Sequence, residues 1–113
     1  MRIGTLVFSG KSGAKYRFEV WPMETRFKPL AAVYIVTKRE VTTGTFSRAG
    51  HEQIYLGQTP DISGPLGTQA QLDSFSASGA NCVCVYAVES EERGAAIKKD
   101  LEEAAVHLKA VVL

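Results

Sequence analysis

The sequence predicts a small α+β domain in which a central antiparallel or mixed sheet is flanked by helices. The chain of 113 residues is long enough for one hydrophobic core but not for two. Short runs of alternating or β-branched apolar residues recur along it, as in strands, whereas residues 90–108 carry apolar residues at helical spacing. We therefore expect one domain over residues 1–113, with a hairpin extension at 1–29 and a core at 30–105.

The N-terminal segment predicts a β-hairpin. Residues 3–8 form an apolar run, a glycine-containing turn follows at 9–13, and residues 15–20 alternate between polar and apolar side chains. Two such runs around a glycine turn are typical of antiparallel strands. The apolar side chains of the second run should face the core, namely Tyr16, Phe18 and Val20.

The middle of the chain predicts two further strands joined by a long loop. Residues 30–37 are apolar and largely β-branched, which suits a central strand covered on both faces. The polar stretch 38–50 contains several Thr, Ser and Gly residues and predicts an exposed loop, and residues 53–56 predict a short strand. Residues 57–67 include three glycines and two prolines, so we expect them to be irregular.

A short helix and a buried strand should come next. Residues 69–78 predict the helix, with Leu72 and Phe75 facing inward, and residues 82–88 predict the strand. Cys82 and Cys84 lie two positions apart and should point to the same face of that strand, about 7 Å from each other. That spacing does not suit a strain-free disulfide, so we expect buried free thiols.

The C-terminal segment predicts the clearest helix of the chain. Ser90 suits the N-cap, and Glu91 and Glu92 suit the positive end of the helix dipole. The residues after 110 form a short apolar tail that should pack on the body of the domain. The expected order of elements is β-β-β-β-α-β-α. The apolar side of the helix should consist of Ile97, Leu101, Ala104, Ala105 and Leu108.

Composition indicates a folded chain without a membrane span. Hydrophobic residues make up 45% and charged residues 22% of the sequence, which is ordinary for a globular domain. No apolar run approaches the roughly 20 residues that a spanning helix needs. The apolar run at 3–8 is not followed by a signal-peptide cleavage pattern, so we expect a soluble cytoplasmic protein that does not act on membranes.

Charge is distributed unevenly along the chain. Residues 1–57 hold nine Lys/Arg against four Asp/Glu, a net charge of +5, whereas residues 58–113 hold four against eight, a net charge of −4. This asymmetry can reflect a basic face for nucleic acid, or two regions that attract each other between copies of the chain. It can equally reflect an acidic surface helix at the C-terminus.

Two short segments carry a resemblance to a known family. Val33-Tyr34-Ile35 lies in one predicted strand, Tyr55-Leu56-Gly57 ends the next, and Gln58-Thr59-Pro60-Asp61-Ile62 follows. This arrangement resembles the signature hairpin and following loop of the GIY-YIG nucleases. The resemblance covers about residues 30–105, and the helix, strand and helix expected after the hairpin match the family's order. The alternative is an unrelated hairpin that holds two core tyrosines.

The resemblance implies a site that hydrolyses phosphodiesters with one divalent metal ion. In the family two tyrosines help to activate water, an arginine steadies the phosphate charge, and a glutamate binds the metal. Such chemistry needs a positive centre near the developing charge and a carboxylate that holds the cation. Tyr34, Tyr55 and Gly57 match family positions, and Lys98 falls where the metal-binding glutamate is expected.

The chain lacks the charged groups that this chemistry needs. No Lys or Arg occurs between Arg48 and Arg93, and an ammonium at Lys98 would repel a metal ion. Asp100 should point to another side of the helix, and Glu102 shares the face of Lys98 but lies about 6 Å further along the axis. The resemblance therefore implies a domain that is not an enzyme, with no catalytic residue assigned, no metal site and no cofactor.

Two kinds of function remain open. The first is a catalytically inactive GIY-YIG-like domain that binds a protein partner or forms a homo-oligomer. The second is a nucleic-acid-binding protein with residual or relocated metal-dependent endonuclease activity, in which case Mg²⁺ would be the cofactor. The residues expected to contact nucleic acid in the second case are Lys38, Arg39, Arg48 and His51.

Overall fold

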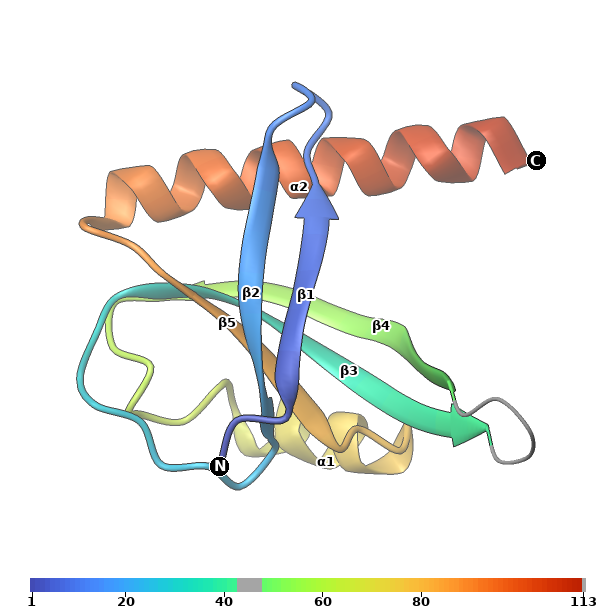
Figure 1. Cartoon of the computed structure of the whole chain (residues 1–113). Coiled ribbons are helices and arrows are strands. Elements are labelled where there is room, and N and C mark those ends of the chain that lie inside the picture. The colour runs from blue at the N-terminus through green and yellow to red at the C-terminus, as the bar shows by residue number, and fades with distance from the viewer. Residues whose placement is uncertain (43–47, 113) are drawn as a thin grey trace.

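The structure is a computed structural model that describes residues 1–42 and 48–112, with only the backbone described at 41–42, 48–49 and 105–112. It is an α+β fold in which five strands form one curled antiparallel sheet of order β1-β2-β5-β3-β4 (Figure 1). The predicted element order is confirmed. The elements are β1 Gly4–Ser9, β2 Lys15–Pro22, β3 Ala32–Thr42, β4 Arg48–Thr59, α1 Gln69–Ala77, β5 Cys82–Ala87 and α2 Glu91–Val112.

The sheet separates two hydrophobic clusters, because successive side chains of a strand point to opposite faces. Figure 1 shows α2 above the sheet and α1 below it. The α2-side cluster contains the apolar residues predicted on β2, both cysteines of β5, and Ile97 and Leu101 of α2. The α1-side cluster contains Tyr34, Phe75 and Val83 together with Ile62 of the loop after β4.

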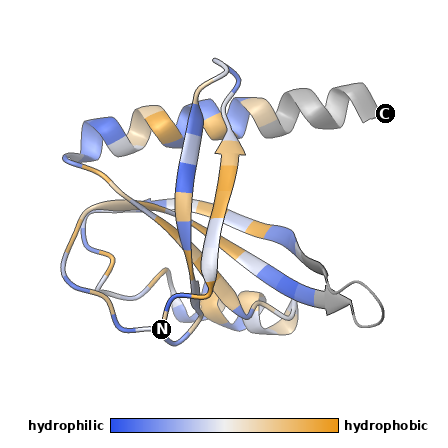
Figure 2. Ribbon diagram, viewed as in Figure 1, coloured by the Kyte–Doolittle hydropathy of each residue, from blue (hydrophilic) through white to orange (hydrophobic). Residues whose placement is uncertain are grey.

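The N-terminal hairpin is part of this single sheet. β2 pairs with β5 through Val20 opposite Cys84, so β2 adjoins the strand at the centre of the fold. Its Tyr16, Phe18 and Val20 are all buried, as predicted, while the residues between them are exposed. Figure 2 shows this alternation of hydrophobic and hydrophilic residues along β2. Without the hairpin the α2-side cluster would be open to water.

The prediction of a loop at 38–50 is wrong at 38–42 and 48–50, and its residues 43–47 lie outside the described residues. β3 continues to Thr42 and β4 already begins at Arg48, so the two strands form a longer hairpin than expected. The pairing passes through a register shift between Val36 and Thr37 and then places polar residues opposite one another. These polar residues occupy a strand because the hairpin arm projects beyond β5, where side chains do not need to be buried.

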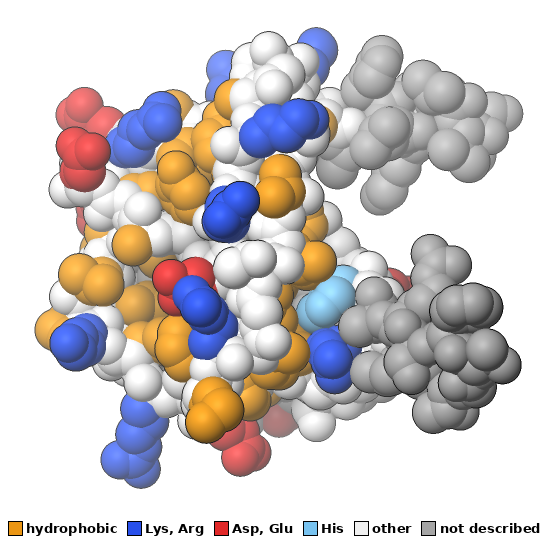
Figure 3. Space-filling view, in the orientation of Figure 1, with side chains coloured by type: hydrophobic (Ala, Val, Ile, Leu, Met, Phe, Trp, Pro, Cys, Tyr) orange, Lys and Arg blue, Asp and Glu red, His pale blue; other side chains and the backbone are white. Residues whose placement is uncertain are grey.

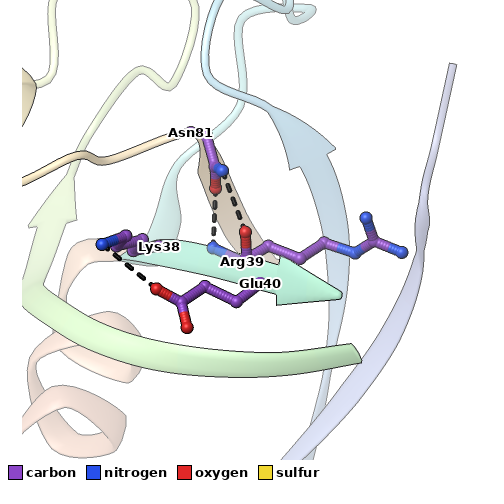
Figure 4. A network of polar contacts seen from close by, with 4 residues as sticks. All are labelled: Lys38, Arg39, Glu40 and Asn81. Atoms are coloured by element: carbon purple, nitrogen blue, oxygen red, sulfur yellow. Dashed lines mark hydrogen bonds and ion pairs between the residues drawn. The ribbon is translucent and has the colours of Figure 1, made fainter. Parts of the chain in front are cut away.

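Asn81 closes the edge of β3 just before the first residue of β5 (Figure 4). The last pair of the β3–β5 ladder is Thr37 opposite Cys82. One residue further on, the Asn81 side-chain oxygen accepts a hydrogen bond from the Arg39 amide at 2.7 Å, and its nitrogen donates to the Arg39 carbonyl at 3.0 Å. The side chain therefore replaces one more residue of the strand and satisfies backbone groups that would otherwise be unpaired.

Both helices begin with side-chain caps. Thr68 and Gln71 form a capping box at α1, with the Thr68 hydroxyl accepting from the Gln71 amide at 3.2 Å. At α2 the predicted N-cap is confirmed, since the Ser90 hydroxyl accepts from the Arg93 amide at 3.2 Å. The buried free thiols of β5 and the inward positions of Leu72 and Phe75 are confirmed as well. Ala105 and Leu108 have no described side chains, and the apolar tail extends α2 to Val112.

Asp100 ties α2 to the turn of the N-terminal hairpin. Its carboxylate accepts hydrogen bonds from the Ser12 amide at 2.9 Å, the Ser12 hydroxyl at 2.7 Å and the Tyr16 hydroxyl at 2.8 Å. Gly10 lies so close that a Cβ there would overlap the carboxylate. The Ser12 hydroxyl and amide, followed by the Tyr16 hydroxyl, lower the pKa of Asp100. The sequence predicted that Asp100 points to another side of α2 than Lys98, and its carboxylate points to the turn of the N-terminal hairpin.

Asp100→Asn should remove a pH-dependent part of the stability. Because the folded state lowers the Asp100 pKa, the carboxylate stabilises the fold above the ordinary aspartate pKa of about 3.9, and this contribution is lost as the pH falls through the lowered value. We expect the wild type to melt at a higher temperature than Asp100→Asn at pH 7, with a smaller difference at pH 3. Thermal unfolding at both pH values measures this, and an equal difference at both would contradict it.

Candidate functional site

The two tyrosines of the resemblance lie side by side between the sheet and α1. The ring centroids of Tyr34 and Tyr55 are 6.1 Å apart, and the Tyr55 ring lies 5.2 Å from that of Phe75 on α1. Tyr34 is only 4% exposed, and its hydroxyl donates a hydrogen bond to the Leu66 carbonyl at 2.9 Å. The two rings therefore form part of the α1-side cluster.

The Tyr34 hydroxyl is poorly placed to act on water. Burial, together with the neighbouring Tyr55, raises the pKa of Tyr34 to about 12. A phenol with this pKa stays protonated near neutral pH, and its hydrogen already binds Leu66. A general base needs a pKa near the working pH and free access to the water that it activates. Tyr34 meets neither condition.

Gly57 provides the space in which the two phenol rings fit. A Cβ at this position would lie 2.5 Å from Tyr34 Cζ and 2.8 Å from Tyr55 Cε2. No atom can occupy that space while both rings keep their places. The glycine that matches the family position is thus explained by packing alone, because the close approach of the rings requires it.

The loop after Gly57 supplies no positive charge to the phenols. Asp61 organises its own turn, since its carboxylate accepts from the Ser63 amide at 2.8 Å, and the Ser63 hydroxyl and amide lower the pKa of Asp61. Ile62, the next residue, is buried in the α1-side cluster. The sequence itself contains no Lys or Arg from 49 to 92.

Lys98 and the two phenols do not share one face of the sheet. Tyr34 and Tyr55 belong to the α1-side cluster, whereas α2, which carries Lys98, packs on the other face through Ile97. The Lys98 ammonium pairs with the Glu102 carboxylate at 2.6 Å, which confirms that these two residues share a side of the helix. The sheet lies between α2 and the Tyr34 ring, so Lys98 does not form a cluster with the phenols.

Of the residues expected to contact nucleic acid, Arg39 and His51 are paired across the β3–β4 hairpin, whereas Lys38 points to the opposite face from Arg39. Lys38 and Arg39 are consecutive in β3, so their side chains leave opposite faces of the hairpin. Lys38 lies against Gly79. Its ammonium pairs with the Glu40 carboxylate at 3.1 Å, and a dashed line in Figure 4 marks this ion pair. Lys38 and Arg39 point apart because consecutive side chains alternate between the two faces of a strand, which they would not do in the loop that the sequence predicted. The side chain of Arg48 lies outside the described residues.

His51 is oriented by a buried hydroxyl. Its Nδ1 lies 2.9 Å from the Thr37 Oγ1, and Thr37 is fully buried. Partial burial and the nearby Arg39 guanidinium lower the pKa of His51, so the imidazole is neutral at pH 7. A neutral imidazole adds no positive charge for phosphate, and His51 therefore fits a structural role at the base of the hairpin arm.

A groove that sequence reasoning missed lies on the α1 face of the sheet. It has a volume of about 620 Å³ and is lined by β2, by the end of β5, by the start of β3 and by the connection between β2 and β3. This connection spans residues 23–31. Exposed residues alternate with buried ones along β2, so the strand has a second face. This alternation in the sequence was the signal that could have indicated the groove. The groove residues are Arg17, Glu19, Trp21, Thr25, Arg26, Phe27, Lys28, Leu30, Ala32, Ile62, Val85, Tyr86 and Ala87.

No family model, curated protein or solved structure matches this chain. Among the described residues, neither helix combines the length and the apolar character that a membrane crossing requires. Within the same residues, no three His, Cys, Asp or Glu side chains come together as metal ligands would. The fold and the groove therefore carry the functional argument.

Proposed function

We propose that this protein is a non-catalytic binding domain with a GIY-YIG-like core, and that it acts by associating with a protein partner or with further copies of itself. The observation that carries the proposal is the state of Tyr34. Its hydroxyl is buried, bound to the Leu66 carbonyl and held at a pKa of about 12. A domain built in this way uses the tyrosine pair to stabilise its core, and its exposed surfaces are left to act by binding.

The order of elements supports relatedness to the nuclease family. β3, with Tyr34, pairs with β4 on one side and with β5 on the other, and α1 lies between β4 and β5 in the chain. This is the hairpin, helix, strand and helix that the resemblance implies. The position of Lys98 on the face of the sheet opposite Tyr34 counts against a shared site and also against the family resemblance itself. Relatedness of the fold and loss of the site are therefore proposed together.

We expect no metal-dependent cleavage of nucleic acid. Supercoiled plasmid incubated with the protein and Mg²⁺ or Mn²⁺ should be nicked no faster than plasmid in buffer, since no described carboxylate set holds the ion. Tyr55→Phe is the control, because it removes one phenol hydroxyl and preserves the ring. Cleavage by the wild type that disappears in Tyr55→Phe would overturn the non-catalytic assignment.

A further inference from the structure

The groove on the α1 face is a preformed apolar surface that nothing in the described chain covers. Its floor is the exposed side of β2 and β5, and Leu30 stands on its rim with 52% of its surface exposed. The rim is held by backbone hydrogen bonds, from the Ile62 amide to the Leu30 carbonyl at 2.8 Å and from the Val88 amide to the Ala31 carbonyl at 2.9 Å. A large exposed leucine beside an apolar groove is typical of a surface that binds another molecule.

The groove carries an excess of positive charge. Arg17, Arg26 and Lys28 line it, against a single acidic lining residue, Glu19. Glu19 lies 3.8 Å from the Arg2 guanidinium, which offsets its charge further. Among the ion pairs of the described residues, none involves the three lining cations. They are available to a partner that brings carboxylates.

An acidic corner of the same molecule adjoins the groove. Ala87 lines the groove, and the chain continues from it directly to the exposed residues Glu89, Glu91 and Glu92 at the start of α2. Figure 3 shows acidic side chains at this end of α2, with hydrophobic side chains and then Lys and Arg side chains below them. Positive and negative surfaces thus lie next to each other on one side of the molecule.

We propose that the groove binds a second copy of this chain in a two-fold symmetric dimer. A two-fold axis between two adjacent patches of opposite charge brings each patch against its complement on the other copy, and it does so twice. Leu30, on the rim of the groove, is then covered by the other copy. Such a contact closes on itself, so it produces dimers and no filaments. The inference rests on the proposed function and names the surface through which self-association occurs.

A polyanion fits this surface less well than a second copy. A nucleic acid lying in the groove would meet the Glu19 carboxylate on the floor and the acidic corner at the end. The acidic corner attracts the cations of another groove, and the same carboxylates repel phosphates. The opposite charges of the two halves of the chain follow the same division, since Arg17, Arg26 and Lys28 belong to the first half and the acidic corner to the second.

Light scattering after gel filtration tests the surface with matched variants. At low salt and about 100 µM, the wild type should have a mass near twice 12.3 kDa. Leu30→Glu should raise the dissociation constant at least about tenfold, because it places a carboxylate in the apolar contact. Ala77→Glu is the control, since Ala77 is exposed at the end of α1, and no described residue of α1 lines the groove. It should leave the dissociation constant unchanged.

A charge exchange tests the pairing itself. Arg26→Glu with Lys28→Glu gives a groove that repels the acidic corner, and Glu91→Lys with Glu92→Lys gives a corner that repels the groove. Each double variant should be a monomer alone, and an equimolar mixture should form a heterodimer, because both contacts are then complementary.

A monomeric wild type, a dimer that Ala77→Glu breaks and Leu30→Glu leaves intact, or a mixture that stays monomeric would each overturn the inference. None of these results depends on the plasmid assay, so the dimer surface and the non-catalytic assignment can fail separately.

Discussion

Replacing Phe18 by alanine is expected to lower the free energy of unfolding by about 3–5 kcal/mol. Phe18 is fully buried at the centre of the α2-side cluster, with its ring 5.1 Å from that of Phe8 and 5.4 Å from that of Tyr86. These contacts join β1, β2 and β5, so the cavity left by the substitution cannot be filled by a local shift. A loss of this size is a large part of the stability of a typical small domain.

Urea denaturation followed by the fluorescence of Trp21, the single tryptophan, measures the change. Thr5→Ala on the neighbouring strand is a suitable control, because Thr5 is exposed and its truncation should change the stability by no more than about 0.5 kcal/mol. If Phe18→Ala lost less than about 1 kcal/mol, the N-terminal hairpin would be an appendage of the core rather than part of it.

Gly57→Ala is expected to cost about 1–3 kcal/mol, although it adds only one methyl group. The new Cβ would lie 2.5 Å from Tyr34 Cζ and 2.6 Å from the Tyr34 hydroxyl oxygen. Tyr34 cannot move away easily, because its ring is buried and its hydroxyl is bound to Leu66. The substitution must therefore either displace the ring or open the pairing of β3 with β4.

The same chain offers a matched control at Gly50, also on β4, where a Cβ would meet nothing within 4 Å. Gly50→Ala should be neutral or slightly stabilising, because alanine has fewer conformations in the unfolded chain. Tyr34→Leu should relieve part of the overlap, so the double variant with Gly57→Ala should lose less stability than the sum of the two single variants. Strict additivity would mean that the phenol ring is not what Gly57 accommodates.

Together these substitutions separate the two roles that the tyrosine hairpin can have. In a hydrolytic site the phenols would be accessible and Gly57 would serve the approach of a substrate. In this protein the Tyr34 ring lies in the core, and Gly57 leaves the space that the ring needs. The proposed function predicts two results together. Gly57→Ala loses stability, and the wild type shows no cleavage in the plasmid assay.

The sequence by itself determined the order of the seven elements and which side of most of them is buried. The alternation in residues 15–20, the apolar run at 82–88 and the Ser90 cap each depend on neighbours within a few positions. Such local patterns report whether a side chain faces the core. They predicted correctly that Cys82 and Cys84 are buried thiols and that Glu102 shares a side of α2 with Lys98.

Only the tertiary structure decided which strands are neighbours and which faces carry the candidate sites. The pairing of β2 with β5 joins residues 60 to 66 positions apart, and it brings the N-terminal hairpin into the central sheet. It also builds the groove from β2, β3, β5 and the segment 23–31, and it places Lys98 and the phenols on opposite faces. The physical reason is that periodicity encodes burial, whereas strand order depends on contacts between distant segments that no local pattern records.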